Sequence, residues 1–246
     1  RKIVHESDEK IIVRNTMRCP AGEVQSETTF LRYEAPTQTE KMFKTFGPET
    51  LDWLPYIFPD PSEATLDGYE KAQADMGEDG VVGLCIDLPT LWTQRREPAE
   101  AGMLDYYDHR DVLDEAIAHE TDWLVKLARR LCELEDRPDF VFFPNSGMIT
   151  LQSVDIMKRY SIPALKKLTA IFSEAGIVTS QHCCGMERAL VEIAATETDL
   201  DCIDPLEVPP MGDCDLAELK EKFGHRLALK GNLHTTQTML HGSVAD

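Results

Sequence analysis

From about residue 48 onward, short apolar segments alternate with longer segments of helical periodicity, and this alternation restricts the fold more than any other feature. The helical segments carry apolar residues at three- and four-residue spacing, as in residues 111–135 and 154–175. The apolar segments lack a polar face, which is typical of strands in a parallel sheet. Strands are predicted at residues 80–87 (GVVGLCID), 139–144 (DFVFFP), 177–183 (IVTSQHC), 201–205 (DCIDP) and 226–231 (RLALKG).

Repeated strand–helix units build either a doubly wound sheet or a TIM (β/α)8 barrel. A doubly wound sheet usually carries a glycine-rich phosphate loop after an early strand, and the sequence contains neither GxGxxG nor GxxxxGK(S/T). The α/β barrel is therefore the predicted fold. A closed barrel needs eight strands, so we expect the chain to be a fragment that lacks the first and last barrel elements.

The first 40 residues have a different pattern. Residues 10–14 and 28–33 have the composition of strands, and the turn-forming run Cys19-Pro20-Ala21-Gly22 lies between them. This predicts a β-hairpin extension at residues 1–40, followed by barrel units at residues 48–246. A chain of 246 residues is within the range of a single barrel domain, so we expect one domain.

Composition excludes two classes of function. The formal net charge of −19 repels phosphate backbones, so nucleic acid is not an expected partner. No stretch of about 18 apolar residues is present to span a bilayer. Seven cysteines without a preceding signal peptide indicate a reduced, cytoplasmic protein.

The run Gln181-His182-Cys183-Cys184-Gly185 closes one of the predicted strands. Because side chains alternate across a strand, His182 and Cys184 are expected on one side and Cys183 on the other. Imidazole and thiolate are ligands that zinc prefers, and active sites of barrels lie at the carboxyl ends of their strands. The spacing alone also fits core cysteines beside a hydrogen-bonded histidine.

A longer stretch of sequence resembles the uroporphyrinogen decarboxylase superfamily, and within it the branch of cobalamin-dependent methyltransferases. The resemblance covers nearly the whole chain and lies in residues 139–143 (DFVFF), 161–167 (SIPALKK), 182–185 (HCCG), 204–213 (DPLEVPPMGD), 216–220 (LAELK) and 229–234 (LKGNLH). The family has a TIM barrel fold. The methyltransferases of the branch supply two zinc ligands from an HxCG motif, which falls on His182 and Cys184 here, and a third from a much later cysteine.

That third position should fall after residue 246, so we take Glu207 as the substitute ligand; an exposed loop acid is the alternative. Asp204 is expected to be able to orient His182 from behind. Asn145, Ser146 and Gly147 follow another strand, and His234 follows the last one. We expect Asn145 and His234 to line the mouth and contact cofactor or substrate, and Gly231 to let backbone approach a ligand.

The resemblance implies a zinc-dependent methyltransferase. It would move a methyl group between a corrinoid protein that carries cobalamin and a small molecule, which is a methoxylated aromatic, a methylamine or a thiol acceptor. Its decarboxylase relatives act on tetrapyrroles with an aspartate and arginines in sequence that this chain does not contain. A tetrapyrrole decarboxylase and a non-catalytic corrinoid or tetrapyrrole binder are the alternatives.

Overall fold

The computed structural model describes residues 1–63, 65–145 and 148–244. These residues form two compact units, one of Arg1–Pro59 with Leu91–Glu120 and one of Asp60–Thr90 with Thr121–Asp246. Each unit has its own sheet, antiparallel in the first and parallel in the second. Of the helices in the described ranges, none is long and apolar enough to cross a membrane.

The first unit contains the predicted hairpin. Strands β2 (Lys10–Cys19) and β3 (Gly22–Leu31) pair along their whole length, with Pro20 and Ala21 as the turn between Cys19 and Gly22. Strands β1 (Lys2–Glu6) and β4 (Thr37–Glu40) flank them and complete the order β1-β2-β3-β4. The hairpin prediction is confirmed, and β1 and β4 extend it to a sheet.

Short helices and an aromatic core complete this unit. The Trp92 indole N–H donates to the buried Glu120 carboxylate at 2.5 Å, and the Trp92 ring stacks on Phe43 with 6.4 Å between centroids. The helical segments are η1 (Pro48–Trp53), α1 (Leu54–Ile57), α3 (Ala99–Asp108) and the first part of α4 (Arg110–Cys132), and η3 (Pro89–Gln94) spans the boundary between the units.

The second unit contains the parallel sheet. All five predicted strand regions are confirmed, and the strands run in the order β5-β6-β7-β8-β9. Their bounds are β5 (Gly83–Cys85), β6 (Phe140–Pro144), β7 (Val178–His182), β8 (Cys202–Asp204) and β9 (Ala228–Leu229). The fold is thus mixed α/β with a parallel sheet. A (β/α)8 barrel has eight such strands, whereas the described residues form a parallel sheet of five that does not close on itself.

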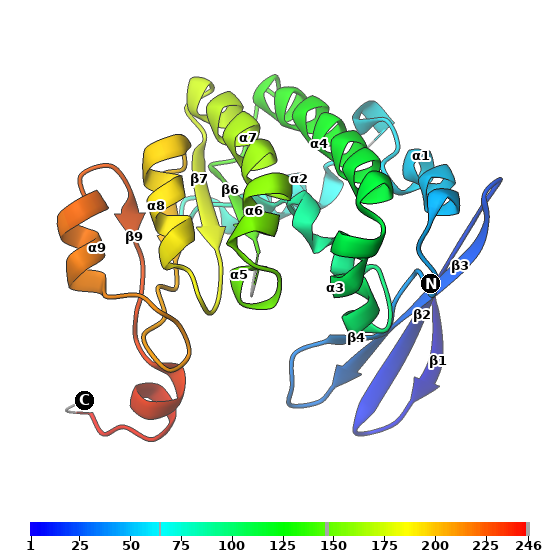
Figure 1. Cartoon of the computed structure of the whole chain (residues 1–246), viewed down its shortest axis with the longest axis horizontal. Helices are drawn as coiled ribbons and strands as arrows, with labels where there is room; N and C mark the ends of the chain where they lie inside the picture. Colours follow the sequence, from blue (N-terminus) through cyan, green and yellow to red (C-terminus); the bar gives the residue numbers. More distant parts are fainter. Residues whose placement is uncertain (64, 146–147, 245–246) are drawn as a thin grey trace. The chain divides into compact units, whose positions relative to one another are not determined.

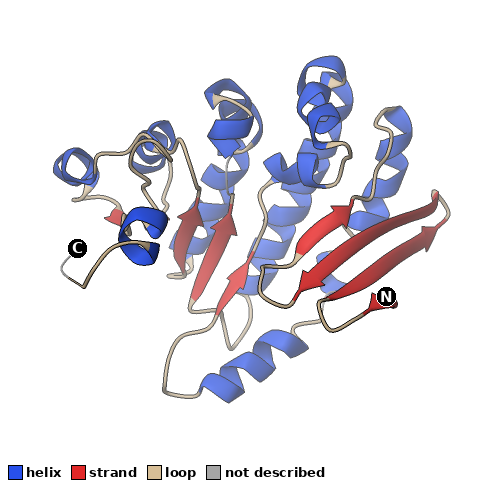
Figure 2. Cartoon of the chain, turned by 90° about the horizontal axis from the view of Figure 1, so that it is seen from below, coloured by secondary structure: helices blue, strands red, loops and turns tan. Residues whose placement is uncertain are grey.

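Helices follow the strands along the chain (Figure 1), and those after β6 and β7 lie on the same side of these strands (Figure 2). The bounds in this unit are η2 (Pro61–Glu63), α2 (Asp67–Met76), α5 (Met148–Leu151), α6 (Val154–Tyr160), α7 (Ile162–Glu174), α8 (Arg188–Glu197), α9 (Leu216–Phe223) and the π-helical turn η4 (Thr235–Leu240).

The single helix predicted at residues 154–175 is wrong in one respect, because α6 and α7 are separate helices that meet at Ser161. Pro163 lies in the first turn of α7 and has no backbone N–H. A proline is tolerated in the first turn of a helix, but within a continuous helix it would break the bond to the carbonyl four residues earlier. The chain therefore restarts its helix at Ile162.

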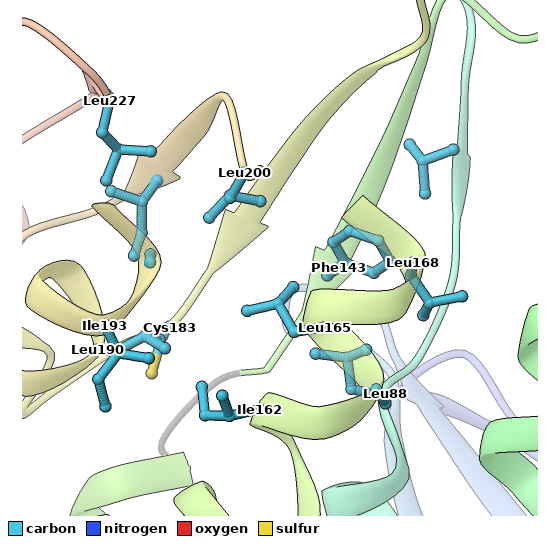
Figure 3. Close-up of a cluster of buried hydrophobic side chains, with 14 of the residues drawn as sticks. Leu88, Phe143, Ile162, Leu165, Leu168, Cys183, Leu190, Ile193, Leu200 and Leu227 are labelled. Carbon is cyan, nitrogen blue, oxygen red and sulfur yellow. The ribbon is translucent and has the colours of Figure 1, made fainter. Parts of the chain in front are cut away.

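The helix-facing side of the sheet carries the core of this unit. Val141, Phe143, Cys183 and Ile203 have no exposed surface. Figure 3 shows Cys183 beside Leu190 and Ile193 of α8, and Phe143 among leucines of α7. The other side of the strands is more open, since Cys85 is exposed and Val178 is 49% exposed. One face of the sheet is therefore packed against helices, while the opposite face is partly exposed and carries His182 at its carboxyl edge.

Candidate functional site

Three neighbouring strands end side by side. The register pairs Pro144 with His182 and His182 with Asp204, so the last residues of β6, β7 and β8 lie in one row. This row is the carboxyl edge of the parallel sheet, where α/β proteins place their active sites. The sheet topology thus brings together residues that are about 20 to 40 positions apart in the sequence.

His182 is held from behind by a carboxylate. Its Nδ1 lies 2.5 Å from Asp204 Oδ1, as expected for a residue that orients the ring. An ionised carboxylate only accepts hydrogen bonds, so His182 Nδ1 carries the hydrogen and donates it. Asp204 Oδ2 in turn lies 2.7 Å from the Lys230 ammonium, and this hydrogen bond raises the pKa of Lys230 above its usual value.

The other nitrogen of His182 faces Cys184. His182 Nε2 lies 2.9 Å from Cys184 Sγ. With the hydrogen of the neutral ring on Nδ1, Nε2 is the acceptor for the Cys184 thiol. Cys183 points the opposite way into the core and is fully buried. The predicted alternation is confirmed. The side chains of His182 and Cys184, which carry atoms able to bind a metal ion, converge on one face, and the cysteine between them packs on the other.

Gly185 turns the chain sharply after these residues. Its φ of +87° is in the left-handed region, and a Cβ there would lie 2.2 Å from Thr150 Oγ1. The Gly185 N–H donates to Glu207 Oε2 at 2.6 Å. Glu207 therefore ties the loop after β8 to the loop after β7.

Glu207 is not gathered with the histidine and the cysteine into a three-donor cluster. In the ranges that the structure describes, no group of three His, Cys, Asp or Glu side chains is placed to hold a metal ion. The carboxylate instead uses one oxygen to accept the Gly185 amide hydrogen. The pair of donors is assembled, and the third ligand stays a prediction.

Cys214 does not supply a third donor in its present state. Its side chain is 2% exposed, and burial raises the pKa of its thiol to about 12, with a further increase from Glu187. Cys214 is also not among the residues that line the cavity beside His182 and Cys184.

Glu187 is a buried carboxyl that sequence reasoning missed. Its side chain has no exposed surface, and its Oε2 accepts the Leu206 N–H at 2.8 Å. Burial raises its pKa from 4.5 to about 9, and the nearby carboxylates of Asp204 and Glu207 add to this effect. Glu187 is therefore a neutral acid at pH 7, and it holds the loop after β8 without placing another negative charge beside the site.

A cavity of about 190 Å³ opens beside His182 and Cys184. Gly231 precedes the lining residue Asn232 and packs closely on the lining residue Pro205, because a Cβ on it would lie 1.9 Å from the Pro205 carbonyl oxygen. Gly231 was expected to allow backbone to approach a ligand; the backbone that it approaches is that of Pro205. The cavity is lined by His182, Cys184, Pro205, Glu207, Val208, Met211, Asn232, Leu233, His234 and Thr235.

Of the other predicted site residues that the structure describes, one lines the cavity and one does not. His234 lines the cavity, as expected. Asn145 lies at the end of β6 and its N–H donates to the His182 carbonyl, but its side chain is fully buried and is not among the cavity-lining residues. Ser146 and Gly147 lie outside the described residues.

Known proteins were compared with the chain at three levels. No family model matches the sequence, and no curated protein sequence matches it. Among solved structures, a methyltransferase from Methanosarcina mazei is similar in fold, with a TM-score of 0.62 and 17% sequence identity over 88% of this chain. The present chain spans 61% of the length of that methyltransferase chain. A likeness at this identity shows a shared fold.

The geometry at the carboxyl edge allows two kinds of chemistry. An imidazole that accepts from a thiol can take up its proton, and a thiolate is the form of cysteine that binds a metal ion or attacks carbon. Asp204 supports either use, because it fixes the ring and stabilises positive charge on it. The cavity beside the pair supplies space for a small molecule.

Proposed function

We propose that the protein is a zinc-dependent methyltransferase built on a (β/α)8 barrel. It moves a methyl group between a corrinoid protein and a small methyl donor or thiol acceptor. The proposal is carried by the paired donors His182 Nε2 and Cys184 Sγ, 2.9 Å apart, at the carboxyl edge of a parallel sheet. The likeness in fold to a methyltransferase supports it.

The two donors fit zinc in kind and in orientation. Zinc binds imidazole nitrogen and thiolate sulfur, and a histidine ligand normally donates its second N–H to a carboxylate. His182 has this arrangement through Asp204. A catalytic site needs a third protein ligand, for which Glu207 or a residue of a longer chain is the candidate. Bound zinc would lower the pKa of a thiol or act as a Lewis acid on an oxygen or nitrogen atom.

The chain's own residues prepare the site for such an ion. Asp204 keeps the hydrogen of His182 on Nδ1, so that the lone pair of Nε2 is directed toward Cys184. Lys230 balances the charge of Asp204 from its other oxygen. The hydrogen bond from the Gly185 N–H to Glu207 Oε2 fixes the loop that carries Cys184. Together these contacts hold both donors in place before any ligand arrives.

The small size of the cavity supports the proposal that a separate partner protein carries the cobalamin. Its volume of about 190 Å³ is below the roughly 300–1,000 Å³ of pockets for drug-sized molecules, and cobalamin is larger than those. Cobalamin would therefore reach the cavity from outside, carried by a separate corrinoid protein. The small methyl donor or acceptor would occupy the cavity itself.

Zinc content tests the proposal most directly. We expect purified protein to bind zinc, and Cys184→Ser and His182→Ala to lose it. Cys183→Ala is the matched control, because it removes the neighbouring thiol from the opposite face and should leave zinc bound. Protein that stays free of zinc with His182 and Cys184 intact would contradict the proposal.

Turnover provides the second test. We expect methyl groups to pass between methylcobalamin and at least one acceptor from a panel of methoxylated aromatics, methylamines and thiols. Zinc binding without turnover would indicate a non-catalytic binder, and decarboxylation of a tetrapyrrole by zinc-free protein would indicate a decarboxylase. Either result would overturn the methyltransferase.

A further inference from the structure

Strand β3 in the first unit has an edge that no strand covers along part of its length. Cys19 and Gly22 close a two-residue turn and exchange both main-chain hydrogen bonds, and such pairs alternate with non-bonded pairs along the hairpin. The backbone N–H and C=O groups of Glu23 and Gln25 therefore point away from β2. Strand β4 lies on that side, but it pairs only with residues 27–29 of β3. Within the described residues, no strand pairs with Glu23 or Gln25 on this side.

The edge is uncovered because the chain leaves β3 after β4. Strand β4 ends at Glu40, and Phe43 then turns to another segment. The Phe43 N–H donates to the Arg95 carbonyl at 2.8 Å, and Phe43 forms a parallel bridge with Arg96. A cavity of about 400 Å³ is lined by residues 23–25 of β3 and residues 42–45 of the departing chain, and we call it the edge groove.

The edge groove has the two features that a sheet needs to accept an added strand. The main chain of Glu23 and Gln25 offers two N–H donors and two C=O acceptors along the edge, and these groups can bond an extended backbone. The cavity beside them is within the roughly 300–1,000 Å³ of pockets that bind small ligands. It therefore has space for a few residues of a peptide.

Acidic side chains on one face of the strand select the charge of such a peptide. Glu40 lies directly opposite Glu27, so its side chain shares a face of the sheet with those of Glu27 and Glu23. Glu49 also lines the groove and forms no ion pair in the ranges that the structure describes. The ammonium group that lines the groove belongs to Lys44, which is 3.0 Å from Glu40. Three carboxylates and one ammonium group leave the groove negatively charged.

The opposite face of β3 supplies an apolar wall. Gly22 and Val24 share this face, and a Cβ on Gly22 would lie 3.5 Å from the ring of Trp53. Trp53 packs edge-on against Phe43, with 6.3 Å between the ring centroids. Val24, Phe43 and Trp53 all line the groove. An apolar side chain on this face of an added strand would be removed from water.

We propose that the edge groove binds an extended peptide of a partner protein, which adds to the sheet antiparallel to β3, where β4 has left it. Lysine or arginine lies on the face of Glu23 and Glu40, and apolar residues lie on the face of Val24 and Trp53. A second copy of this chain is less suited, because it would bring the same acids together in a chain of net charge −19. The groove makes no use of His182 or Cys184, so the proposal goes beyond the methyltransferase.

Backbone methylation of a peptide tests the added strand on the unaltered protein. The probe is an acetylated and amidated six-residue peptide that alternates lysine with valine. Residues directly opposite each other share a face, so the lysines lie opposite Glu23 and Gln25 and their amides point to β3. N-methylation of the lysines should weaken binding by at least about tenfold in calorimetry, whereas N-methylation of the valines should leave it unchanged. Equal affinities of the two methylated peptides, or tighter binding when glutamate replaces lysine, would overturn the proposal.

Amide hydrogen exchange locates the peptide. In the free protein, the amides of Glu23 and Gln25 should exchange faster than that of Val24, which faces β2. The lysine–valine peptide should slow the exchange of Glu23 and Gln25. If their protection instead rises with protein concentration and without peptide, a second copy covers the edge and the proposal is wrong. Displacement of the peptide by an equal concentration of butylammonium would assign the cavity to a small organic cation and would also overturn it.

A single acid tests the charge selection. Glu49→Gln is the suitable variant, because Glu23 and Glu40 are already paired with Arg18 and Lys44. It should weaken binding of the lysine–valine peptide by about threefold and leave unchanged the binding of a peptide with glutamine in place of lysine. Glu34→Gln changes an exposed acid that does not line the groove, and should have no effect. Equal weakening in both variants would reduce the selection to net charge and contradict a basic peptide held in the groove.

Discussion

The two faces of the parallel sheet use similar residues for different ends. On the helix-covered face, Cys183 packs against α8 without any exposed surface. One residue later and on the other face, Cys184 meets the imidazole of His182. The difference lies in the partners, which are aliphatic on one side and ionisable on the other. The chemistry of a cysteine here is set by the face of the strand on which it lies, and this contrast can be tested.

The largest effect is expected from truncating the packed face. Phe143→Ala should lower the free energy of unfolding by about 3–5 kcal/mol, because it leaves a cavity in a fully buried cluster. Phe142→Ala, on the opposite face of the same strand, should lower it by less. Urea denaturation measures both values. An equal loss at Phe142 would mean that the open face is covered in solution, and the contrast between the faces would fail.

On the opposite face, Asp204→Asn should act on binding. The amide keeps the shape of the side chain but loses the charge that holds the Nδ1 hydrogen of His182, so zinc affinity should fall by about 10-fold to 100-fold. Competition with a chromophoric chelator measures this change. Asp215→Asn, which alters an acid that caps α9, serves as a control and should leave zinc affinity as it is.

Glu187 predicts a pH dependence of stability. Its pKa is about 9 in the folded protein and 4.5 in an exposed carboxyl, so between these values only the unfolded state releases the proton. Stability should therefore fall as pH rises through this window, by up to about 1.4 kcal/mol per pH unit. Glu187→Gln should remove this slope, as measured by urea denaturation at pH 6, 7 and 8. A slope that persists in the variant would assign it to other groups.

The smallest effect compares the adjacent cysteines. Cys183→Ala should lower the free energy of unfolding by about 1 kcal/mol through lost packing, and Cys184→Ala by less than about half of that. Thiol-specific alkylation should show the reverse order, with Cys184 modified faster than the buried Cys183. Fast modification of Cys183 in folded protein would contradict its place in the core.

Sequence reasoning succeeded where a local rule decides the outcome. The five strands were predictable from short apolar runs, and the meeting of His182 with Cys184 from the alternation along β7. It erred at the join of α6 and α7, where Pro163 restarts the helix in a pattern that is otherwise continuous. That signal was present in the sequence, since proline removes one backbone donor.

The loops after β7 and β8 were less predictable, because long-range contacts fix them. A glutamate at position 187 is expected on the surface, and its burial follows from the bond to Leu206 N–H, 19 residues later. Leu206 itself has a φ of +60°, which is uncommon for a residue with a side chain. The position of Glu207 depends on both features. For this reason its placement against Gly185 could not be read from its distance in sequence to the strand.

The short strand β8 carries a consequence for tolerance to insertions and deletions. Only Cys202–Asp204 pair with β7, and a slip of one residue would put Ile203 where Asp204 now meets His182. Two hydrogen bonds fix the ends of this segment. The Asp201 carboxylate accepts the Thr179 N–H at one end, and the Glu187 carboxyl accepts the Leu206 N–H at the other. An insertion after Leu206 leaves both of these hydrogen bonds intact. Deleting one residue between Asp201 and Leu206 breaks one of them and shifts Asp204 away from His182.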